Sequence, residues 1–312
     1  MAVGYALGLL GNNAHMRILF IGGTRFVGLH MARQAIERGH EVTVFHRSER
    51  EIAGLESAQH VYGDRDSDLS GLAVGEWDVV IDACAYRPAQ IDVLARALEG
   101  RVGKFVFIST ISVHDAEIPA GSDESAALAD TSMIEDLDSL TTVVDGTTYG
   151  PLKVLCEAAT LRHYPDALMI RPTYIIGPDD YTDRFTKYVH LIRAGGVVDV
   201  PEPRTAPWQY IDVRDLAAFT LDAIDAGLSG PFHVAAPAGG TTYESMLNAI
   251  IDETGEGAAA LNWISVEDAA ARDTVFPFWA GGRDLGMLRL SAARATAAGL
   301  KSRPLVDSIR SV

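Results

Sequence analysis

Tyr149 and Lys153 stand four residues apart in the segment YGPLK, a spacing that suits acid–base chemistry on a carbon-bound oxygen. On a helix, positions i and i+4 share one face, so the two side chains would lie together. We expect the ammonium to lower the pKa of the phenol toward a range useful for proton transfer. The same ammonium could bond the ribose of a nicotinamide cofactor. The alternative is a surface pair of the i, i+4 kind, which occurs often by chance.

A third hydroxyl is needed to polarise the substrate oxygen, and three candidates lie close together in the sequence. Ser109, Thr110 and Ser112 stand at or just after the end of an apolar segment that we expect to be a strand. Together with Tyr149 and Lys153, one of these hydroxyls would complete a set for hydride transfer to or from a carbinol carbon. The residues alone leave the choice among the three open.

A glycine-rich turn near the start of the chain points to a nucleotide cofactor. Residues 21–28 read IGGTRFVG, directly after an apolar run and before a stretch with helical spacing. In such a strand–turn–helix unit, backbone N–H groups face a pyrophosphate, and glycine lets the ligand approach closely. The alternative is a glycine-rich turn without a ligand. We predict that the cofactor contacts the whole turn, namely Gly22, Gly23, Thr24, Arg25, Phe26, Val27 and Gly28.

The end of the second expected strand favours NADP, with NAD as the alternative. An acidic residue there would bind the ribose 2′-hydroxyl of NAD, whereas a basic one accommodates a 2′-phosphate. The sequence has Arg47 there and no carboxylate until Glu49. Arg47 and Arg25 could converge on the ribose, because a guanidinium matches a phosphate bidentately; solvated loop arginines are the alternative. Asp64 is expected to accept a hydrogen bond from adenine, or else to be an ordinary turn residue.

Apolar runs and helix-period segments alternate along the first half of the chain, which predicts a parallel sheet with right-handed crossovers. The expected fold class is α/β: a Rossmann-type, doubly wound parallel sheet with a smaller C-terminal substrate domain. We assign residues 16–171 and a return segment at about 206–236 to the dinucleotide-binding domain, and residues 172–205 and 237–312 to the substrate-binding domain. The expected strands are 17–21, 41–45, 60–62, 77–83, 104–109, 167–171 and 232–235; the expected helices are 26–38, 88–98, 149–163, 241–254 and 266–272, and residues 210–226 should be a strand end feeding a helix.

The composition of the 312-residue chain argues against some classes of partner. A formal charge of −16 and a pI near 4.9 do not suit a nucleic-acid surface, which needs clustered Lys and Arg. No apolar run reaches the ~18–20 residues of a membrane span. Cys84 and Cys156 lie in apolar neighbourhoods and are predicted to be buried thiols, which suits a cytoplasmic protein. Residues 1–15 are interpreted as an N-terminal extension, with a short signal peptide as the alternative.

The segment between His114 and Thr148 is acidic, with nine Asp or Glu and no Lys or Arg. It is long for a connection between a strand and a helix, which usually takes a few residues. One interpretation is a solvated surface loop. The other is a lid over the active site, since the segment joins the two stretches that carry the hydroxyl candidates and Tyr149.

With these motifs, the chain resembles an extended short-chain dehydrogenase/reductase of the NAD-dependent epimerase/dehydratase family. The resemblance implies that Thr110 is the hydroxyl that joins Tyr149 and Lys153. It also implies that Ala83, Cys84 and Ala85 line the cofactor and that the segment from Pro172 to Tyr174 passes near the nicotinamide. The resemblance rests on GGTRFVG (22–28), GD (63–64), IDACAY (81–86), FISTISV (107–113), YGPLK (149–153), RPTYIIGP (171–178) and YIDVRDLA (210–217).

Two departures from the family pattern bear on the substrate. Family members that act on sugar nucleotides usually carry an arginine shortly before the motif that is YIDV here, where it holds the substrate diphosphate. This chain has Trp208 in that place, with Arg204 a few residues earlier. The arginine in the glycine-rich turn, Arg25, also occurs in a subgroup that includes chloroplast stem-loop RNA-binding proteins.

Two classes of function follow. The first is an oxidoreductase that moves a hydride between a nicotinamide and a small substrate, such as a sugar or sugar nucleotide, as an epimerase, dehydratase or reductase. The second is a non-catalytic nucleotide sensor or RNA-associated protein on the same fold. The set of Thr110, Tyr149 and Lys153 favours the enzyme. We expect a small-molecule substrate and no nucleic-acid or membrane partner, and we allow a homodimer. Histidines such as His114 and His233 lack metal-ligand spacing, so no metal is assigned.

Overall fold

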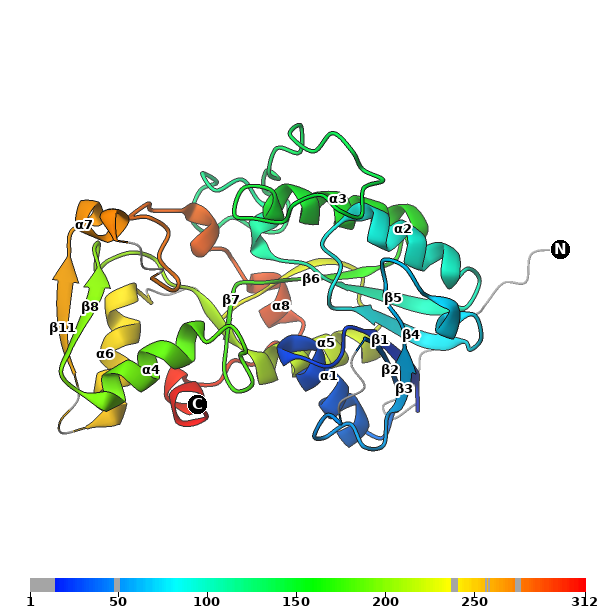
Figure 1. The fold of residues 1–312 in the computed structure, drawn as a ribbon, viewed down its shortest axis with the longest axis horizontal. Coiled ribbons are helices and arrows are strands. Elements are labelled where there is room, and N and C mark those ends of the chain that lie inside the picture. Colours follow the sequence, from blue (N-terminus) through cyan, green and yellow to red (C-terminus); the bar gives the residue numbers. More distant parts are fainter. Residues whose placement is uncertain (1–14, 48–50, 237–240, 256, 258, 273–275) are drawn as a thin grey trace.

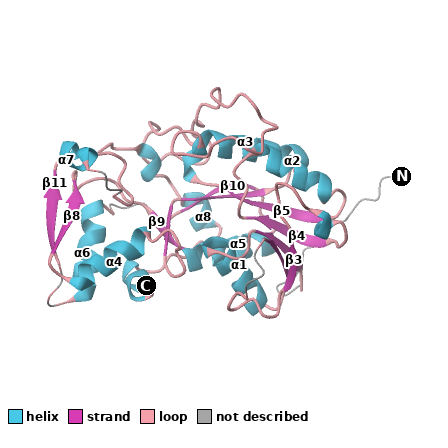
Figure 2. Cartoon of the chain, viewed as in Figure 1, coloured by secondary structure: helices cyan, strands magenta, loops and turns pink. Residues whose placement is uncertain are grey.

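A parallel sheet of seven strands forms the centre of the protein, in the order β10-β6-β5-β4-β1-β2-β3 (Figures 1 and 2). The computed structural model describes residues 15–47, 51–236, 241–255, 257, 259–272 and 276–312; residues 1–14 of the expected N-terminal extension lie outside them. The predicted Rossmann-type fold is confirmed. The strands are β1 (Arg17–Ile21), β2 (Glu41–His46), β3 (Gln59–Tyr62), β4 (Trp77–Asp82), β5 (Val102–Ile108), β6 (Leu168–Pro172) and β10 (Gly230–Val234).

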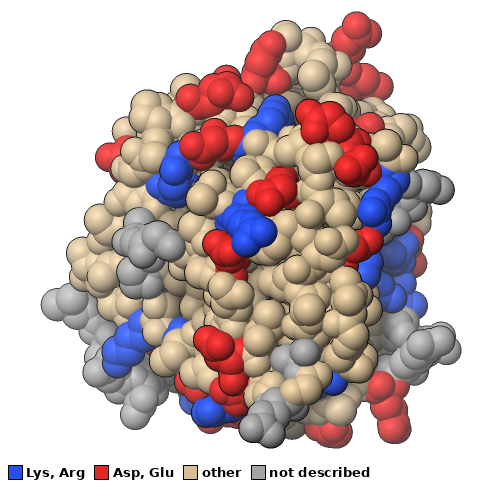
Figure 3. Space-filling view, turned by 90° about the vertical axis from the view of Figure 1, so that its left-hand side faces the viewer, with Lys and Arg blue, Asp and Glu red and all other residues tan. Residues whose placement is uncertain are grey.

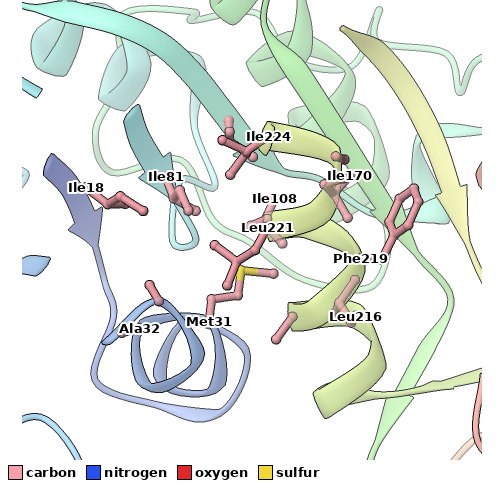
Figure 4. Close-up of a cluster of buried hydrophobic side chains, with 14 of the residues drawn as sticks. Ile18, Met31, Ala32, Ile81, Ile108, Ile170, Leu216, Phe219, Leu221 and Ile224 are labelled. Atoms are coloured by element: carbon pink, nitrogen blue, oxygen red, sulfur yellow. The ribbon is translucent and has the colours of Figure 1, made fainter. Parts of the chain in front are cut away.

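Two pairs of helices cover the two faces of this sheet. Helices α1 (Phe26–Glu37) and α5 (Val213–Asp225) pack together on one face, and α2 (Pro88–Ala97) and α3 (Tyr149–His163) on the other (Figure 1). Figure 4 shows how apolar side chains of α1 and α5 meet those of the strands. The strands are buried on both faces, which is why they appear in the sequence as continuous apolar runs. The cluster in Figure 4 includes Ile18, Met31, Ala32, Ile81, Ile108, Ile170, Leu216, Phe219, Leu221 and Ile224.

The strand order places the cofactor crevice. From β1 the chain proceeds outward through β2 and β3, then returns to β4 on the other side of β1. The carboxyl ends of β1 and β4 therefore lie at the point where the order reverses, which is where open α/β sheets bind ligands. Ile21 pairs in register with Asp82, so the glycine turn after β1 and the segment after β4 face each other.

The smaller C-terminal part lies beside the carboxyl end of the sheet (Figure 1). Its strands form two parallel pairs, β11 with β8 and β7 with β9. Sequence reasoning missed β7, β8, β11 and α4, and found α6 and α7. A second apolar core, which includes Trp208 and Phe278, holds this part together. The elements are β7 (Tyr174–Ile176), α4 (Arg184–Ala194), β8 (Val197–Pro201), β9 (Tyr210–Asp212), α6 (Tyr243–Thr254), β11 (Ala260–Ile264), α7 (Val266–Ala271), α8 (Ala293–Ala297) and α9 (Leu305–Arg310).

The acidic segment has almost no regular structure. A short 3-10 turn, Ile111–Val113, precedes it, and an isolated antiparallel bridge joins His114 to Leu128. Its conformation is held by aspartates that accept hydrogen bonds from nearby Ser and Thr, such as Asp145 from Thr147 and Thr148. Whether the segment acts as a lid stays a prediction.

None of the helices in the described part of the chain combines the length and the apolar composition that a bilayer crossing requires.

Candidate functional site

The glycine turn after β1 is packed too closely to admit side chains. Gly22 has φ +84, and a Cβ there would lie 2.6 Å from Cys84 Sγ. A Cβ on Gly23 would lie 2.8 Å from Phe20 Cβ, and one on Gly28 would lie 2.6 Å from the Gly22 carbonyl oxygen. Gly28 stands in the first turn of α1, so the helix start can press directly on the backbone of the turn. The turn therefore has the form that a pyrophosphate site needs.

The start of α1 is left open toward a ligand. Its N-cap residue, Arg25, makes no side-chain capping hydrogen bond, and no acidic residue stands in the first turn. The first N–H groups of a helix have no partner within the helix and attract anions. Thr24 and Val27 flank these groups, and Phe26 adopts φ +36, so the bend into the helix is tight. These residues fit the phosphates of a dinucleotide.

Gly28→Ala tests this packing. The new Cβ would meet backbone atoms of Gly22 and Gly23, which cannot give way as a flexible side chain can. We expect a loss of about 1–3 kcal/mol in the free energy of unfolding and at least about tenfold weaker NADPH binding. Urea unfolding and fluorescence titration measure the two effects. Gly146→Ala is the matched control, because a Cβ there meets nothing within 4 Å. Unchanged NADPH affinity in Gly28→Ala would remove the turn from the cofactor site.

The structure does not bring Arg25 and Arg47 together. Arg47 has a side chain that is 79% exposed, and it faces Asp64 across 3.6 Å. Arg25 instead lies over the ring of Tyr181, 5.3 Å from its centroid. The two arginines thus have different neighbours, and their predicted convergence on one phosphate is not seen. Arg47 and Asp64 are close enough to contact the same adenosine.

An arginine that sequence reasoning missed, Arg65, fixes the segment after β4. Its guanidinium donates to both carboxylate oxygens of the fully buried Asp82, at 2.8 and 2.9 Å, and lies 3.2 Å from Cys84 Sγ. The Cys84 N–H also donates to Asp82. Ala83, Cys84 and Ala85 are therefore held rigidly opposite the glycine turn. Cys84 as a whole residue is half-buried rather than buried. The desolvation of its sulfur raises the pKa of the thiol.

Tyr149 and Thr110 meet at the carboxyl end of β5. Tyr149 is the first residue of α3, and Thr110 caps the short turn that follows β5, accepting a hydrogen bond from the Ser112 N–H. The Thr110 side chain interacts with the Tyr149 hydroxyl and opposes the rise of its pKa. Of the other two candidates, the Ser112 hydroxyl contacts Thr110 at 3.3 Å, and the Ser109 hydroxyl is buried without a partner in the described structure. Thr110 is thus the hydroxyl beside the phenol, although its catalytic role stays a prediction.

Lys153 is buried next to this pair. Its Nζ donates to the carbonyl oxygens of Ala85 and Ile108, at 3.0 and 2.7 Å, and lies 4.3 Å from the centre of the Phe107 ring. The ammonium therefore ties the segment after β4 to the end of β5. Burial lowers its pKa.

The electrostatics of Tyr149 differ from the sequence-based expectation. Burial raises the pKa of the phenol, and the Thr110 hydrogen bond and the charge of Arg184 oppose this rise. The predicted lowering of the pKa is not seen, because the burial of the phenol outweighs the groups that lower it. Lys153 donates instead to backbone carbonyls. The phenol is therefore protonated at neutral pH and is set up to donate.

The last predicted cofactor residue, Pro172, ends β6 and is buried beside Val234 of β10. After it, the chain enters β7 and then a loop at residues 177–183 that runs toward the crevice. Tyr181 in this loop is 63% exposed and lies near both Arg25 and Tyr149. Sequence reasoning gave this loop no role.

Comparisons with known proteins bear on the nucleotide-binding domain and on the fold. Residues 22–137 match the protein family described as NAD(P)H-binding, and this stretch holds the glycine turn, Arg47, Asp64 and Thr110. The chain contains an NAD(P)-binding Rossmann domain. Among solved structures, the whole chain resembles a candidate epimerase from Burkholderia cenocepacia (TM-score 0.73, 18% identity, 96% of this chain and 97% of that one). It also resembles UDP-glucose 4-epimerase from Thermus thermophilus, solved with NAD (TM-score 0.69, 18% identity, 95% and 97% covered). At these identities the likeness shows the fold alone.

Two curated relatives are closer in sequence. The chain is 28% identical over 229 residues to the chloroplast stem-loop binding protein of 41 kDa b of Arabidopsis thaliana, covering 68% of this chain and 56% of that protein. It is 26% identical over 226 residues to dTDP-4-dehydrorhamnose reductase of Mycolicibacterium smegmatis, covering 70% and 64%. The chain therefore spans less than two thirds of the length of either relative.

Proposed function

We propose that this protein is an NAD(P)-dependent oxidoreductase that transfers a hydride between a nicotinamide and a carbinol or ketone carbon of a small substrate. The observation that supports this most is the placement of three side chains at the carboxyl edge of a dinucleotide-binding sheet. Thr110 follows β5, Tyr149 begins α3, and the buried Lys153 donates to carbonyl oxygens just after β4 and at the end of β5. A protein that only sensed a nucleotide would not need these three side chains together.

Each side chain has a distinct role in the proposed reaction. When bound, the nicotinamide supplies the carrier for the hydride. Tyr149 donates its proton to the substrate oxygen during reduction and accepts one during oxidation, and Thr110 orients that oxygen by hydrogen bonding. Lys153 keeps positive charge near the phenol and is the candidate ligand for the nicotinamide ribose. Because burial raises the pKa of the phenol, Tyr149 carries the proton that reduction requires at neutral pH.

The cofactor preference that we propose is NADP, with NAD as the alternative. Arg47 at the end of β2 offers a guanidinium to a ribose 2′-phosphate, and Asp64 beside it would face adenine. The similar epimerase from Thermus thermophilus was solved with NAD, whereas one relative is a reductase. The cofactor carried by the purified protein separates these cases: retained NAD would indicate an epimerase or dehydratase, and ready exchange of NADPH a reductase.

Arg47→Ala tests the 2′-phosphate contact. A charge-assisted hydrogen bond is worth about 1.5–3 kcal/mol, so we expect roughly tenfold to hundredfold weaker NADPH binding and little change for NADH. Isothermal titration with both cofactors measures this. Arg17→Ala is the matched control, because Arg17 also faces an aspartate, Asp78, but lies at the amino end of β1. A preference for NADH that Arg47→Ala leaves unaltered would contradict the assignment.

The second candidate function, RNA association, is favoured by one observation, the likeness to the chloroplast stem-loop binding protein. It would place the chain in the subgroup marked by the arginine of GGTRFVG. Charge argues against it. On the face shown in Figure 3, basic side chains are interspersed with acidic ones. Among the ion pairs of the C-terminal part, Arg204 faces Glu244 and Arg272 faces Asp199. Binding of a stem-loop RNA that persisted at about 150 mM salt would favour this alternative.

A further inference from the structure

Arg184 presents a cation to the reacting side of the site. It is the first residue of α4, and its guanidinium lies over the ring of Phe278, 5.5 Å from the centroid. Its Nε donates to the Thr182 hydroxyl at 2.9 Å, and that hydroxyl in turn donates to Asp180. The positive charge acts on the hydroxyls of both Tyr149 and Tyr174, where it lowers the pKa. The bond to Thr182 and the contact with Phe278 fix the orientation of the guanidinium. Phe278 lies against Tyr174, and Tyr174 packs against the apolar cluster that contains Ile111, the residue after Thr110.

Arg184 has no ion-pair partner among the described residues, and the Asp180 carboxylate is linked to it only through the Thr182 hydroxyl. In the described part of the chain, its two terminal nitrogens donate no hydrogen bond. Two other arginines near the site face carboxylates: Arg65 faces Asp82, and Arg171 faces Glu157. Arg25, like Arg184, lies over an aromatic ring and has no ion pair among the described residues. Arg204, which is also stacked on an aromatic ring, faces Glu202 and Glu244.

The ring beneath Arg184 is held in a strained position. Phe278 has φ +62, which a non-glycine residue rarely adopts. Its ring lies 4.8 Å from that of Tyr174 and 5.9 Å from that of Trp208, and it is nearly buried. Such outliers persist only where the surrounding structure enforces them, and they cluster at ligand sites. The Phe278 ring thus holds the guanidinium against the second apolar core, so that Arg184 is only partly exposed.

We propose that Arg184 binds an anionic group of the substrate, a carboxylate or a phosphate, next to the carbon–oxygen bond served by Tyr149. This inference rests on the proposed function and names the class of substrate. The guanidinium of Arg184 is planar, and its two terminal nitrogens donate no hydrogen bond within the described residues. They can therefore bind the two oxygens of a carboxylate or phosphate bidentately. A chain with a formal charge of −16 repels anions in general, so an anionic substrate needs a local cation of this kind.

The test compares pairs of aldehydes that differ in charge. Succinic semialdehyde and its methyl ester probe a carboxylate, and glycolaldehyde phosphate and glycolaldehyde probe a phosphate. With NADPH-saturated protein, we expect the charged member of at least one pair to show about tenfold or greater preference in kcat/KM and in affinity. Arg184→Met should abolish this preference and Arg184→Lys should keep part of it, because lysine retains the charge but not the fork. Arg204→Met is the matched control and should leave the preference unchanged.

Affinity is measured by the fluorescence of the tryptophans, so the test does not depend on turnover. One outcome separates the two proposals. If charged aldehydes bind better than neutral ones, Arg184→Met removes this preference and the wild type reduces none of the aldehydes, then the anion site is supported and the proposed hydride transfer is contradicted. Equal binding of charged and neutral probes, no binding at millimolar concentration, or a preference that survives in Arg184→Met would overturn the anion site. Thermal unfolding of each variant, and Arg184→Lys in particular, keeps loss of folding apart from loss of the ligand.

Discussion

Replacing Tyr149 by phenylalanine is expected to lower the rate of NADPH-dependent carbonyl reduction by about 10²–10⁴-fold, the usual contribution of a positioned general acid. The ring would remain at the start of α3, and only the hydroxyl that meets Thr110 would be lost. NADPH affinity should stay within about twofold, because the glycine turn and Lys153 are untouched. The effect should therefore fall on kcat.

Steady-state kinetics on any aldehyde that the protein reduces, together with NADPH titration, measures the two quantities. Tyr164→Phe is the matched control, since Tyr164 is stacked on Phe105 at 4.4 Å, away from the site. Full turnover in Tyr149→Phe would make the assigned proton donor wrong.

The pH profile gives an independent reading of the same group. Burial raises the pKa of Tyr149, so the phenol keeps its proton through neutral pH. Reduction, which needs the protonated form, should be flat from about pH 6 to about pH 9 and fall above that range. Oxidation, which needs the ionised form, should rise across the same range. An opposite trend for reduction would mean that another group supplies the proton.

The sheet could be predicted because its strands are buried on both faces and separated by strong signals. In the sequence itself, the apolar run 17–21 marks β1, the glycines after it mark the turn, and Gly39 marks the end of α1. In the C-terminal part, β7 and β8 are three and five residues long and stand among prolines and glycines. Helix α4 begins after Asp183. This residue has a left-handed conformation and makes no side-chain capping hydrogen bond, so the usual signal for the start of a helix is missing.

The site could be predicted only where its chemistry is local in sequence. The i, i+4 spacing indicated Tyr149 and Lys153. The strand end indicated three hydroxyls, among which only the family resemblance selected Thr110. Arg65 and Arg184 could not be predicted from the sequence. Arg65 is recognised by its contact with Asp82, and Arg184 by its lack of an ion pair among the described residues, and the fold decides both. The direction of the Tyr149 pKa shift was predicted wrongly for the same reason. The i, i+4 spacing shows neither the burial of the phenol nor the carbonyl oxygens that Lys153 contacts.

Glu157→Leu is expected to lower the free energy of unfolding by about 3–5 kcal/mol, the cost of leaving a buried partner charge unpaired. Glu157 lies on α3, one turn beyond Lys153, and its carboxylate accepts two hydrogen bonds from Arg171, at 2.9 and 2.6 Å. Both side chains are about 5–6% exposed. Arg171 also reaches the His114 ring at 3.3 Å, and no other carboxylate of the described residues pairs with it. The change would therefore loosen the helix that carries Tyr149.

The double variant Glu157→Leu with Arg171→Met distinguishes an unpaired charge from lost packing. If the cost comes from stranding the guanidinium, removing Arg171 as well should recover most of the stability, because apolar pairs often replace buried ion pairs with little loss. If the cost comes from the shape of the site, the double variant should be as unstable as the single one. Urea unfolding of the wild type, both single variants and the double variant closes the cycle. A loss under about 1 kcal/mol in Glu157→Leu would mean that Arg171 reaches water or another acceptor, and that α3 does not depend on this pair for its position.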